Sequence, residues 1–314
     1  MKIAIVGCGL VGRAWAISFA RAGRQVALWD VHDGAARTAL ETIGELLPDL
    51  HANDLLNGAA PDAILARIAI ARSLEEALAG AVHVQENTPE DVATKRAVFA
   101  RLDAIAVADC VLASSTSAIL PSKFTEGLAG RARCLVVHPI NPPYLIPAVE
   151  VVPAPWTSAE VVQRSADLLR EAGHAPIVMA KEIDGFIMNR LQGALLEEAF
   201  RLVDQGFASA GDIDIGLREG LALRWSFMGP FETIDLNAPD GVRDYVQRYQ
   251  SIYANIFPTT QWRADWAGPA LAKIEAQRRA ALPAEGLKAR QQWRDRRLMA
   301  LAAHKRKAAR DMGE

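Results

Sequence analysis

Two residues in neighbouring apolar segments, His138 and Glu150, are of the types that carry out general acid–base chemistry. Glu150 lies within the apolar run Ala148–Val152, where a carboxylate without a partner is energetically costly. His138 ends another apolar run and is the obvious partner for that carboxylate. A histidine oriented by a carboxylate is a general base. A buried pair that only stabilises the fold is the alternative interpretation.

Polar side chains follow two of the predicted strands. The run Ser114–Ser117 follows an apolar segment, and His138–Pro143 follows the next one. Ligands of open α/β sheets bind at the carboxyl ends of the strands, so both runs are candidate site segments. Ser117 could instead be a simple helix cap, because serine is a favoured capping residue.

A glycine-rich turn near the N-terminus predicts a dinucleotide site. Gly7-Cys8-Gly9-Leu10-Val11-Gly12 stands between an apolar strand and a helical pattern. Gly7 allows the tight turn, Gly9 lets the backbone approach a pyrophosphate, and Gly12 lets the helix pack closely on the strand. Asp30 ends the second strand, 18 residues after Gly12, and is placed to accept hydrogen bonds from ribose hydroxyls.

The residues around Asp30 favour NAD over NADP. A carboxylate repels a 2′-phosphate, and neither Trp29 before it nor Val31 and His32 after it is an arginine that could hold one. FAD, and a glycine turn that binds no dinucleotide, are the alternatives.

These residues need a particular set of elements to position them. Strands and helices alternate in the first half of the chain, which predicts a parallel sheet covered on both faces. The predicted strands are Lys2–Val6, Gln25–Asp30, Ile68–Ala71, Val82–Glu86, Cys110–Ser114, Cys134–His138, Ala148–Val152 and Ile177–Met179. The predicted helices between them are Leu10–Ala22, Ala35–Leu47, Pro61–Arg67, Asp91–Ile105 and Ala159–Ala172.

The pattern changes near Gly185, after which only helical periodicity is found. The helical segments are Gly185–Gly206, Ser209–Glu219, Pro239–Ile256, Pro269–Ala281 and Leu287–Arg310. The sequence therefore predicts an α/β protein in two domains: a Rossmann-type doubly wound parallel sheet over residues 1–184, and an all-helical domain over residues 185–314.

With these motifs in place, the chain resembles the L-3-hydroxyacyl-CoA dehydrogenase superfamily, and within it the lambda-crystallin branch. The superfamily motifs are Gly7–Gly12, Glu90 and Lys95, Ser114–Ser117, His138-x-x-Asn141-Pro142, Glu150, Gly185–Arg190 and Met228–Glu232. The branch motifs are His138–Tyr144, Gly220–Arg224 and Gln292–Asp295.

The resemblance implies an NAD-dependent oxidation of a 3-hydroxy acid and a role for each matching residue. It makes His138 the general base with Glu150 as its partner, and it makes Ser117 and Asn189 hydrogen-bond donors to the reacting oxygen. It places Glu90, Lys95 and Asn141 along the nicotinamide half of the cofactor. Ser115 departs from the pattern, because the CoA enzymes usually have asparagine there, and it is left outside the predicted site.

The charge of one segment favours a small free acid over a CoA thioester. In the acyl-CoA enzymes, the helical segment after the second strand helps to hold CoA, whose phosphates need cations. Here Val31–Gln85 has no lysine, three arginines and eight acidic residues. A small acid such as L-gulonate needs a cation for its carboxylate, and Arg224 and Arg294 are the candidates. Both could equally form ordinary ion pairs. An L-3-hydroxyacyl-CoA dehydrogenase stays the alternative.

Composition excludes several other classes. The 314 residues are 51% hydrophobic and 23% charged with a net charge of −2, which is typical of a globular protein and not of a disordered chain. No apolar run is long enough for a membrane span, Arg13 interrupts any signal-like stretch, and no metal-ligand spacing is found. Cys8, Cys110 and Cys134 are expected to be buried free thiols of a cytoplasmic protein.

The C-terminal segment is basic and leaves one question of partners open. Residues 287–314 hold nine basic and three acidic residues. We interpret this as the solvated face of a terminal helix, with nucleic-acid binding as the alternative. The expected partners are a small hydroxy acid and a second copy of the chain, with no nucleic acid and no membrane. A purely structural, crystallin-like role is the non-enzymatic alternative.

Overall fold

A computed structural model describes residues 1–313 of the chain. It divides into two compact units: Met1–Met188 together with the described residues from Arg294 onward, and Asn189–Trp293. The division into domains at residue 184 stays a prediction, and its last residue, Glu314, lies outside the described residues.

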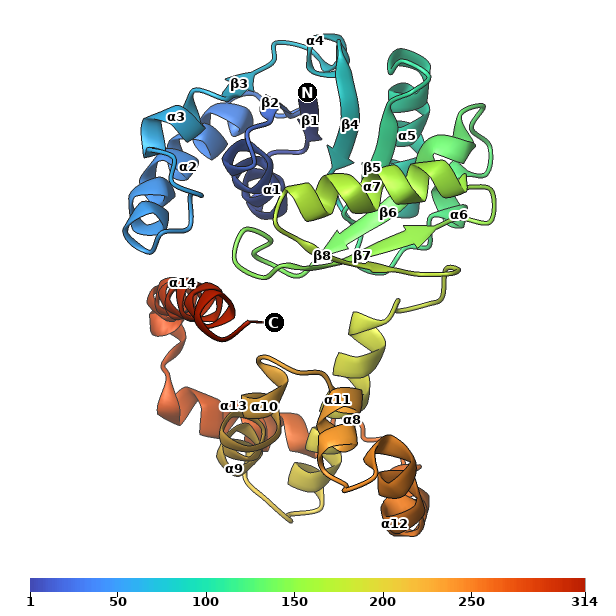
Figure 1. The fold of residues 1–314 in the computed structure, drawn as a ribbon, viewed down its shortest axis with the longest axis vertical. Helices are drawn as coiled ribbons and strands as arrows, with labels where there is room; N and C mark the ends of the chain where they lie inside the picture. Colours follow the sequence, from blue (N-terminus) through green and yellow to red (C-terminus); the bar gives the residue numbers. More distant parts are fainter. Residues whose placement is uncertain (314) are drawn as a thin grey trace. The chain divides into compact units, whose positions relative to one another are not determined.

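The first unit is built on one sheet of eight strands in the order β3-β2-β1-β4-β5-β6-β7-β8 (Figure 1). The strands are β1 (Lys2–Val6), β2 (Gln25–Trp29), β3 (Ile68–Ile70), β4 (Ala81–Glu86), β5 (Val111–Ser114), β6 (Cys134–Pro139), β7 (Ala148–Pro153) and β8 (Ala175–Val178). The predicted doubly wound sheet is thus confirmed, with β1 at the point where the strand order reverses.

One strand pair differs from the expected parallel arrangement. β7 runs antiparallel to β6, whereas the other pairs of the sheet are parallel. Eight residues separate the two strands, and a parallel neighbour needs a crossover of a dozen residues or more. The chain therefore turns back on itself directly after His138.

Helices cover both faces of the sheet because successive strand residues point to opposite faces. Ile3 and Ile5 of β1 belong to one buried apolar cluster, and Ala4 and Val6 belong to the other. The covering helices are α1 (Leu10–Arg21), α2 (Ala35–Ala52), α3 (Pro61–Leu65), α4 (Leu74–Leu78), α5 (Val92–Ile105), α6 (Ser122–Thr125), η1 (Arg131–Arg133) and α7 (Ala159–Glu171).

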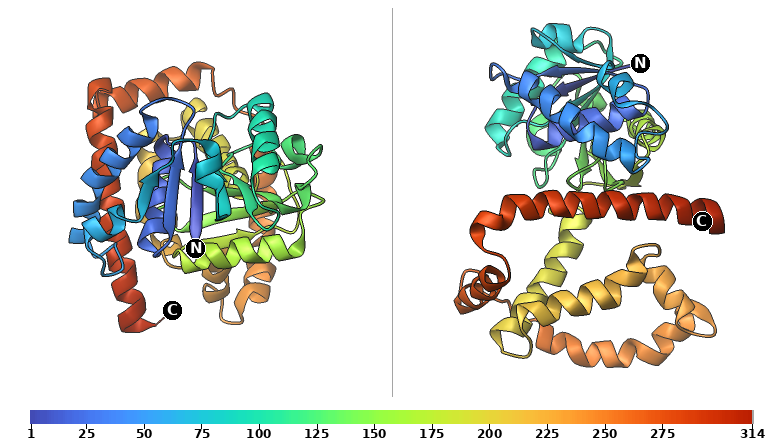
Figure 2. Two further views of the ribbon diagram at one scale, coloured as in Figure 1. Left: turned by 90° about the horizontal axis from the view of Figure 1, so that it is seen from above. Right: turned by 90° about the vertical axis from the view of Figure 1, so that its left-hand side faces the viewer.

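The second unit is helical, as predicted. Its elements are α8 (Met188–Asp204), α9 (Ala210–Ile215), the π-helical turn η2 (Gly216–Leu221), α10 (Ala222–Trp225), α11 (Pro230–Leu236), α12 (Gly241–Ile256), η3 (Phe257–Thr260), α13 (Pro269–Ala281) and η4 (Ala284–Gly286) (Figure 2). The helix predicted from Gly185 begins only at Met188. Gly185 and Phe186 have left-handed φ values of 77° and 49°, which a right-handed helix cannot contain.

The last helix, α14 (Leu287–Met312), leads from the second unit back to the first. Met299 is 1% exposed and belongs to the apolar cluster of the first unit. Arg296 lies 3.4 Å from Asp49, and Arg306 lies 3.6 Å from Asp54 at the end of α2. Among the described residues, no helix has the length and apolar character needed to cross a membrane.

Candidate active site

The antiparallel turn between β6 and β7 places His138 beside Glu150. The two residues are direct cross-strand partners, and His138 Nδ1 lies 2.6 Å from Glu150 Oε2. His138 is 4% exposed and Glu150 is fully buried. The cost of burying a lone carboxylate predicts that Glu150 pairs with His138, and the two side chains are in contact.

The second oxygen of Glu150 is held by the backbone at the start of α8. Glu150 Oε1 accepts hydrogen bonds from the amides of Ile187 (2.7 Å) and Met188 (2.8 Å). The left-handed residues Gly185 and Phe186 turn these amides toward it, and the buried Phe186 ring stands 5.6 Å from the His138 ring. Burial alone would raise the pKa of Glu150, but the bonds from His138, Met188 and Ile187 outweigh it and lower that pKa.

This arrangement fixes which nitrogen of His138 can do chemistry. An ionised carboxylate only accepts hydrogen bonds, so Nδ1 carries the proton of the neutral ring and Nε2 carries the lone pair. Nε2 has no hydrogen-bond partner in the part of the chain that the structure describes. The pair can therefore take a proton at Nε2 and hold the resulting imidazolium next to a carboxylate.

The glycine turn has the shape that a dinucleotide needs. A side chain at Gly7 (φ 89°) would place its Cβ 2.8 Å from the Asn87 carbonyl oxygen, and one at Gly12 would place it 1.9 Å from the Gly7 carbonyl oxygen. No atom lies within 4 Å of the corresponding point at Gly9. The backbone at Gly7 and Gly12 thus leaves no room for a side chain, whereas the space beside Gly9 is free. Gly9 precedes the first turn of α1, where the sequence predicts the pyrophosphate.

Asp30 is tied to this turn. Its Oδ2 accepts the Cys8 amide at 2.7 Å, and its Oδ1 accepts the His32 amide at 2.9 Å. Each carboxylate oxygen has a second lone pair, so Asp30 keeps acceptor capacity for a ribose while its orientation is fixed.

Comparison with known proteins agrees with this geometry. The model of the 3-hydroxyacyl-CoA dehydrogenase NAD-binding domain matches residues 2–183, and the model of the C-terminal domain of the same family matches residues 185–268. The chain belongs to the 3-hydroxyacyl-CoA dehydrogenase family. It is an oxidoreductase of that family, and its cofactor is NAD.

Individual members of the family are similar over most of the chain. Lambda-crystallin of Oryctolagus cuniculus is 42% identical, with 97% of this chain and 96% of the relative covered. L-carnitine dehydrogenase of a Pseudomonas species is 38% identical, covering 78% and 76%. The solved structure of 5-formyl-3-hydroxy-2-methylpyridine 4-carboxylic acid 5-dehydrogenase, an NAD+-dependent dismutase, matches with a TM-score of 0.82 and 28% identity over 96% of both chains.

A second buried ion pair in this member of the family is not predicted by the sequence. Lys95 is 1% exposed, and its ammonium lies 3.0 and 3.1 Å from the two oxygens of the buried Glu86. Glu86 also accepts hydrogen bonds from Ser114 Oγ (2.6 Å) and the Thr88 amide (2.5 Å). Glu86 ends β4, where His83 and Gln85 interrupt the apolar residues, so the sequence carries no signal for its burial comparable to that of Glu150.

Several other predicted site residues follow the carboxyl ends of the strands. Glu90 accepts hydrogen bonds from Thr116 Oγ1 and from the amides of Ser117 (3.1 Å) and Ala118 (3.0 Å). Ser117 and Asn141 are exposed, after β5 and after β6 respectively. Leu10 and Val11 open α1 directly after the turn.

Asn189 and the candidate cations are distributed over both units. Asn189 begins the second unit, directly after Met188. Arg224, also in the second unit, places Nη1 3.5 Å from Asn237 Oδ1. Arg294 belongs to the first unit and forms an ion pair of 2.7 Å with its neighbour Asp295. No group of residues that could hold a metal ion is found in residues 1–313.

Proposed function

We propose that this dehydrogenase oxidises the C3 hydroxyl of a small 3-hydroxy acid, such as L-gulonate, with His138 as the general base. The observation that carries the proposal is the buried His138–Glu150 pair, in which Nδ1 and both carboxylate oxygens are already bonded while Nε2 remains available. The names of two similar proteins support an acid substrate, since carnitine is a 3-hydroxy acid and the other is a dehydrogenase of a pyridine carboxylic acid.

The proposed reaction separates the proton from the hydride. Bound NAD+ supplies the acceptor for the hydride that leaves C3. His138 Nε2 takes the hydroxyl proton, and Glu150 stabilises the imidazolium that forms. General acid–base catalysis of this kind is typically worth about 10²–10⁴-fold in rate. Ser117 and Asn189 hydrogen-bond the reacting oxygen in this proposal.

The proposed cofactor site runs from the glycine turn to the ends of β4 and β6. Its residues are Gly7, Gly9, Leu10, Val11, Gly12, Asp30, Glu90, Lys95 and Asn141. Lys95 would act indirectly, because its ammonium is buried against Glu86 and the Thr88 carbonyl oxygen (3.2 Å). It would hold the segment after β4 in place rather than touch NAD.

Charge and packing around α2 favour a free acid over a CoA thioester. The segment Val31–Gln85 has a large acidic excess, and α14 of the same chain forms ion pairs with Asp49 on α2 and with Asp54 just after it. Arg296 and Arg306 of α14 thus have acidic partners within the protein, which supports the proposal that the charge of α14 is a helix face. We propose Arg224 as the ligand of the substrate carboxylate. Arg294 is the second candidate, because the Arg294 guanidinium already has Asp295 as a partner.

We also propose a cytoplasmic homodimer that associates through the helical domain of residues 185–314. Large apolar side chains are exposed throughout the second unit, among them Leu191 (63%), Phe227 (70%) and Phe231 (79%). Exposed apolar side chains gathered on one unit of a protein favour a protein interface there. The three cysteines are free and buried, as predicted, which fits a reducing compartment.

The test is NADH formation by the purified protein with NAD+ and either L-gulonate or L-3-hydroxybutyryl-CoA. We expect turnover of the free acid, its loss in His138→Gln with NADH binding retained, and a sharply raised KM for the acid in Arg224→Met but not in Arg278→Met, a surface control from the same unit. Turnover of the thioester alone would refute the free-acid proposal. An unchanged KM in Arg224→Met would remove that residue from the site.

A further inference from the structure

A chain of hydrogen bonds between buried and half-buried side chains adjoins the glycine turn and is not part of the proposed site. We call it the Ser115 network: Trp15, His83, Gln85, Asn87 and Ser115. Ser115 Oγ accepts from Trp15 Nε1 (3.0 Å) and from Gln85 Nε2 (2.7 Å), and it contacts Asn87 Oδ1 at 2.8 Å. Gln85 Oε1 lies 3.0 Å from His83 Nε2.

The donors and acceptors of this network allow one arrangement. An indole nitrogen and an amide nitrogen only donate, so Ser115 Oγ accepts twice and must give its single proton to Asn87 Oδ1. Gln85 Nε2 also donates to the Val137 carbonyl oxygen at 3.2 Å, which leaves its oxygen to accept from His83 Nε2. The side-chain amides of Gln85 and Asn87 can each be placed in two orientations, which exchange the oxygen and the nitrogen. These hydrogen bonds fix one orientation for each.

One end of the network holds the glycine turn. The side-chain Nδ2 of Asn87 donates to the carbonyl oxygens of Gln85 (2.8 Å) and Val6 (3.3 Å). The backbone amide of Asn87 donates to the same Val6 carbonyl oxygen at 2.7 Å. Val6 is the last residue before Gly7. Asn87 also approaches both end glycines, with its Nδ2 3.3 Å from the point where a Gly12 Cβ would stand. The Asn87 side chain therefore forms the floor of the turn.

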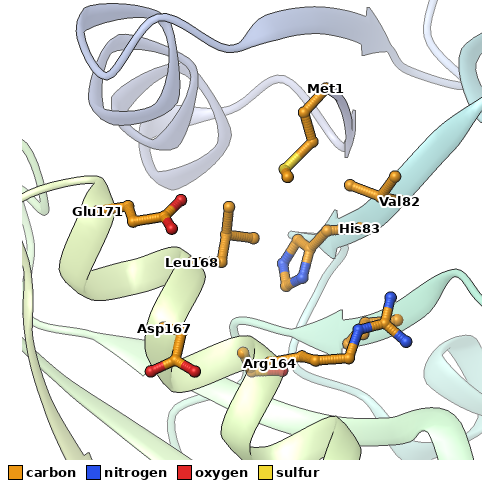
Figure 3. Close-up of a pocket in the computed structure, with 9 residues that line it drawn as sticks. Met1, Val82, His83, Arg164, Asp167, Leu168 and Glu171 are labelled. Atoms are coloured by element: carbon orange, nitrogen blue, oxygen red, sulfur yellow. The ribbon is translucent and has the colours of Figure 1, made fainter.

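The other end of the network reaches a cavity beside the first residues of β4 and β5. The cavity has a volume of about 240 Å³ and is lined by His83 together with residues of β4, β5 and α7. Figure 3 shows the His83 ring between Leu168 and Arg164, with Val82 of the same strand beside it. His83 Nδ1 has no partner among the described residues. Among the described residues the ring thus forms a hydrogen bond only with Gln85, and the network is anchored at the Asn87 end.

We propose that Ser115 is a positioning residue for NAD, which acts by holding the Asn87 amide against the strand end that carries the glycine turn. Ser115 touches neither the turn nor the proposed base, so its effect passes through Asn87. Its hydroxyl is the only group of the network that contacts three of the other four members. Removing it leaves Asn87 Oδ1 without its donor and frees the floor of the turn to move.

The test is Ser115→Ala, measured by NADH binding to the purified full chain without substrate. We expect the dissociation constant for NADH to rise about tenfold, which corresponds to the loss of about one hydrogen bond. At saturating NAD+, kcat should stay within about twofold of the wild type, because the His138–Glu150 pair is unchanged. Ser115→Thr keeps the hydroxyl and should restore NADH binding.

Two further variants distinguish positioning from general destabilisation. Ser165→Ala removes a buried serine hydroxyl that donates to the Val161 carbonyl oxygen of its own helix, and it should leave NADH binding unchanged. Asn87→Ala removes the same bond from its other partner and should weaken NADH binding by itself. The double variant with Ser115→Ala should then be no weaker than the poorer single variant, because residues that act through one bond are not additive.

A Ser115→Ala protein that melts earlier but binds NADH as the wild type does would overturn the proposal, as would additive losses in the double variant. If Ser115→Ala does not fold, unchanged NADH binding by Asn87→Ala refutes the proposal on its own. The measurement uses no substrate, so its failure and a failure of the proposed 3-hydroxy-acid activity are separate results.

Discussion

Replacing Glu150 by glutamine tests whether its charge, and not only its shape, serves the proposed base. Glu150 Oε2 lies 2.6 Å from His138 Nδ1, and both side chains are almost fully buried. Solvent therefore screens the pair little. Glutamine has the same shape and can still accept one hydrogen bond, but it carries no charge.

The expected loss of rate follows from that contact. Unit charges about 4 Å apart interact by about 4 kcal/mol at an effective dielectric constant of about 20, and a neutral hydrogen bond of about 1 kcal/mol remains in the variant. The imidazolium formed in the reaction therefore loses about 2–3 kcal/mol of stabilisation, and we expect kcat to fall about 30- to 150-fold. NADH binding should not change, because neither residue belongs to the proposed cofactor site.

Stability must be measured beside activity, because Glu150 also holds backbone. Its Oε1 accepts the amides of Ile187 and Met188, and the NH₂ group of glutamine must face either those donors or His138. We expect a loss of about 1–3 kcal/mol in the free energy of unfolding. Asp103→Asn is the matched control: it weakens a mostly buried ion pair with Arg133 of 2.8 Å and should reduce stability without reducing kcat.

The result that would refute this reasoning is a folded Glu150→Gln enzyme with kcat within about threefold of the wild type. The charge would then have no part in the reaction, and Glu150 would be a structural partner of His138. An equal fall of kcat in Asp103→Asn would instead attribute the loss to the fold as a whole.

Three further predictions concern the cofactor and the stability of the first unit. Asp30→Ala should weaken NADH binding and narrow its advantage over NADPH, because the carboxylate that repels a 2′-phosphate is gone; an unchanged ratio of the two dissociation constants would contradict the assignment of Asp30. Ser18→Ala should raise the free energy of unfolding by about 1 kcal/mol in a denaturant titration, because the Ser18 hydroxyl is buried without a partner inside α1. Burial lowers the pKa of His83 and of His174 to about 4, so the unfolded state binds more protons between pH 6.5 and 4. Each residue should remove up to about 3 kcal/mol of stability as the pH falls through that window, and a His83→Gln protein with the same pH slope as the wild type would exclude His83 from this effect.

Burial explains why much of the fold could be predicted from the sequence. The strands of the sheet are short apolar runs because both of their faces are covered, and such runs are recognisable without knowing the order of the strands. Helix α13 was predicted with its exact bounds because Pro269 begins it, a residue favoured in the first turn. Periodicity does not report conformations such as that of Phe186, whose left-handed φ delays the start of α8.

The direction of β7 could not be predicted from alternation alone, yet the contact between His138 and Glu150 could. A buried carboxylate needs a partner whatever the direction of its strand. The burial of Glu150 therefore predicts the pair, whereas the alternation of strands and helices does not predict the antiparallel turn that forms it. The connection between His138 and Glu150 is too short for a parallel crossover, so its length predicts that β7 runs antiparallel to β6.

The substrate cation is a different problem, because an exposed arginine carries no comparable penalty. Arg294 can satisfy its charge with its neighbour Asp295, and Arg224 has only a 3.5 Å contact with an asparagine oxygen. A weakly held cation is less stabilised in the protein and therefore has more to gain from a carboxylate ligand, since an ion pair already formed must be broken before another is made. This difference in existing partners, and not the sequence position, is the reason to expect the larger rise in KM from Arg224→Met than from Arg294→Met. The reverse order in the two KM values would show that Arg294 leaves Asp295 to bind the acid.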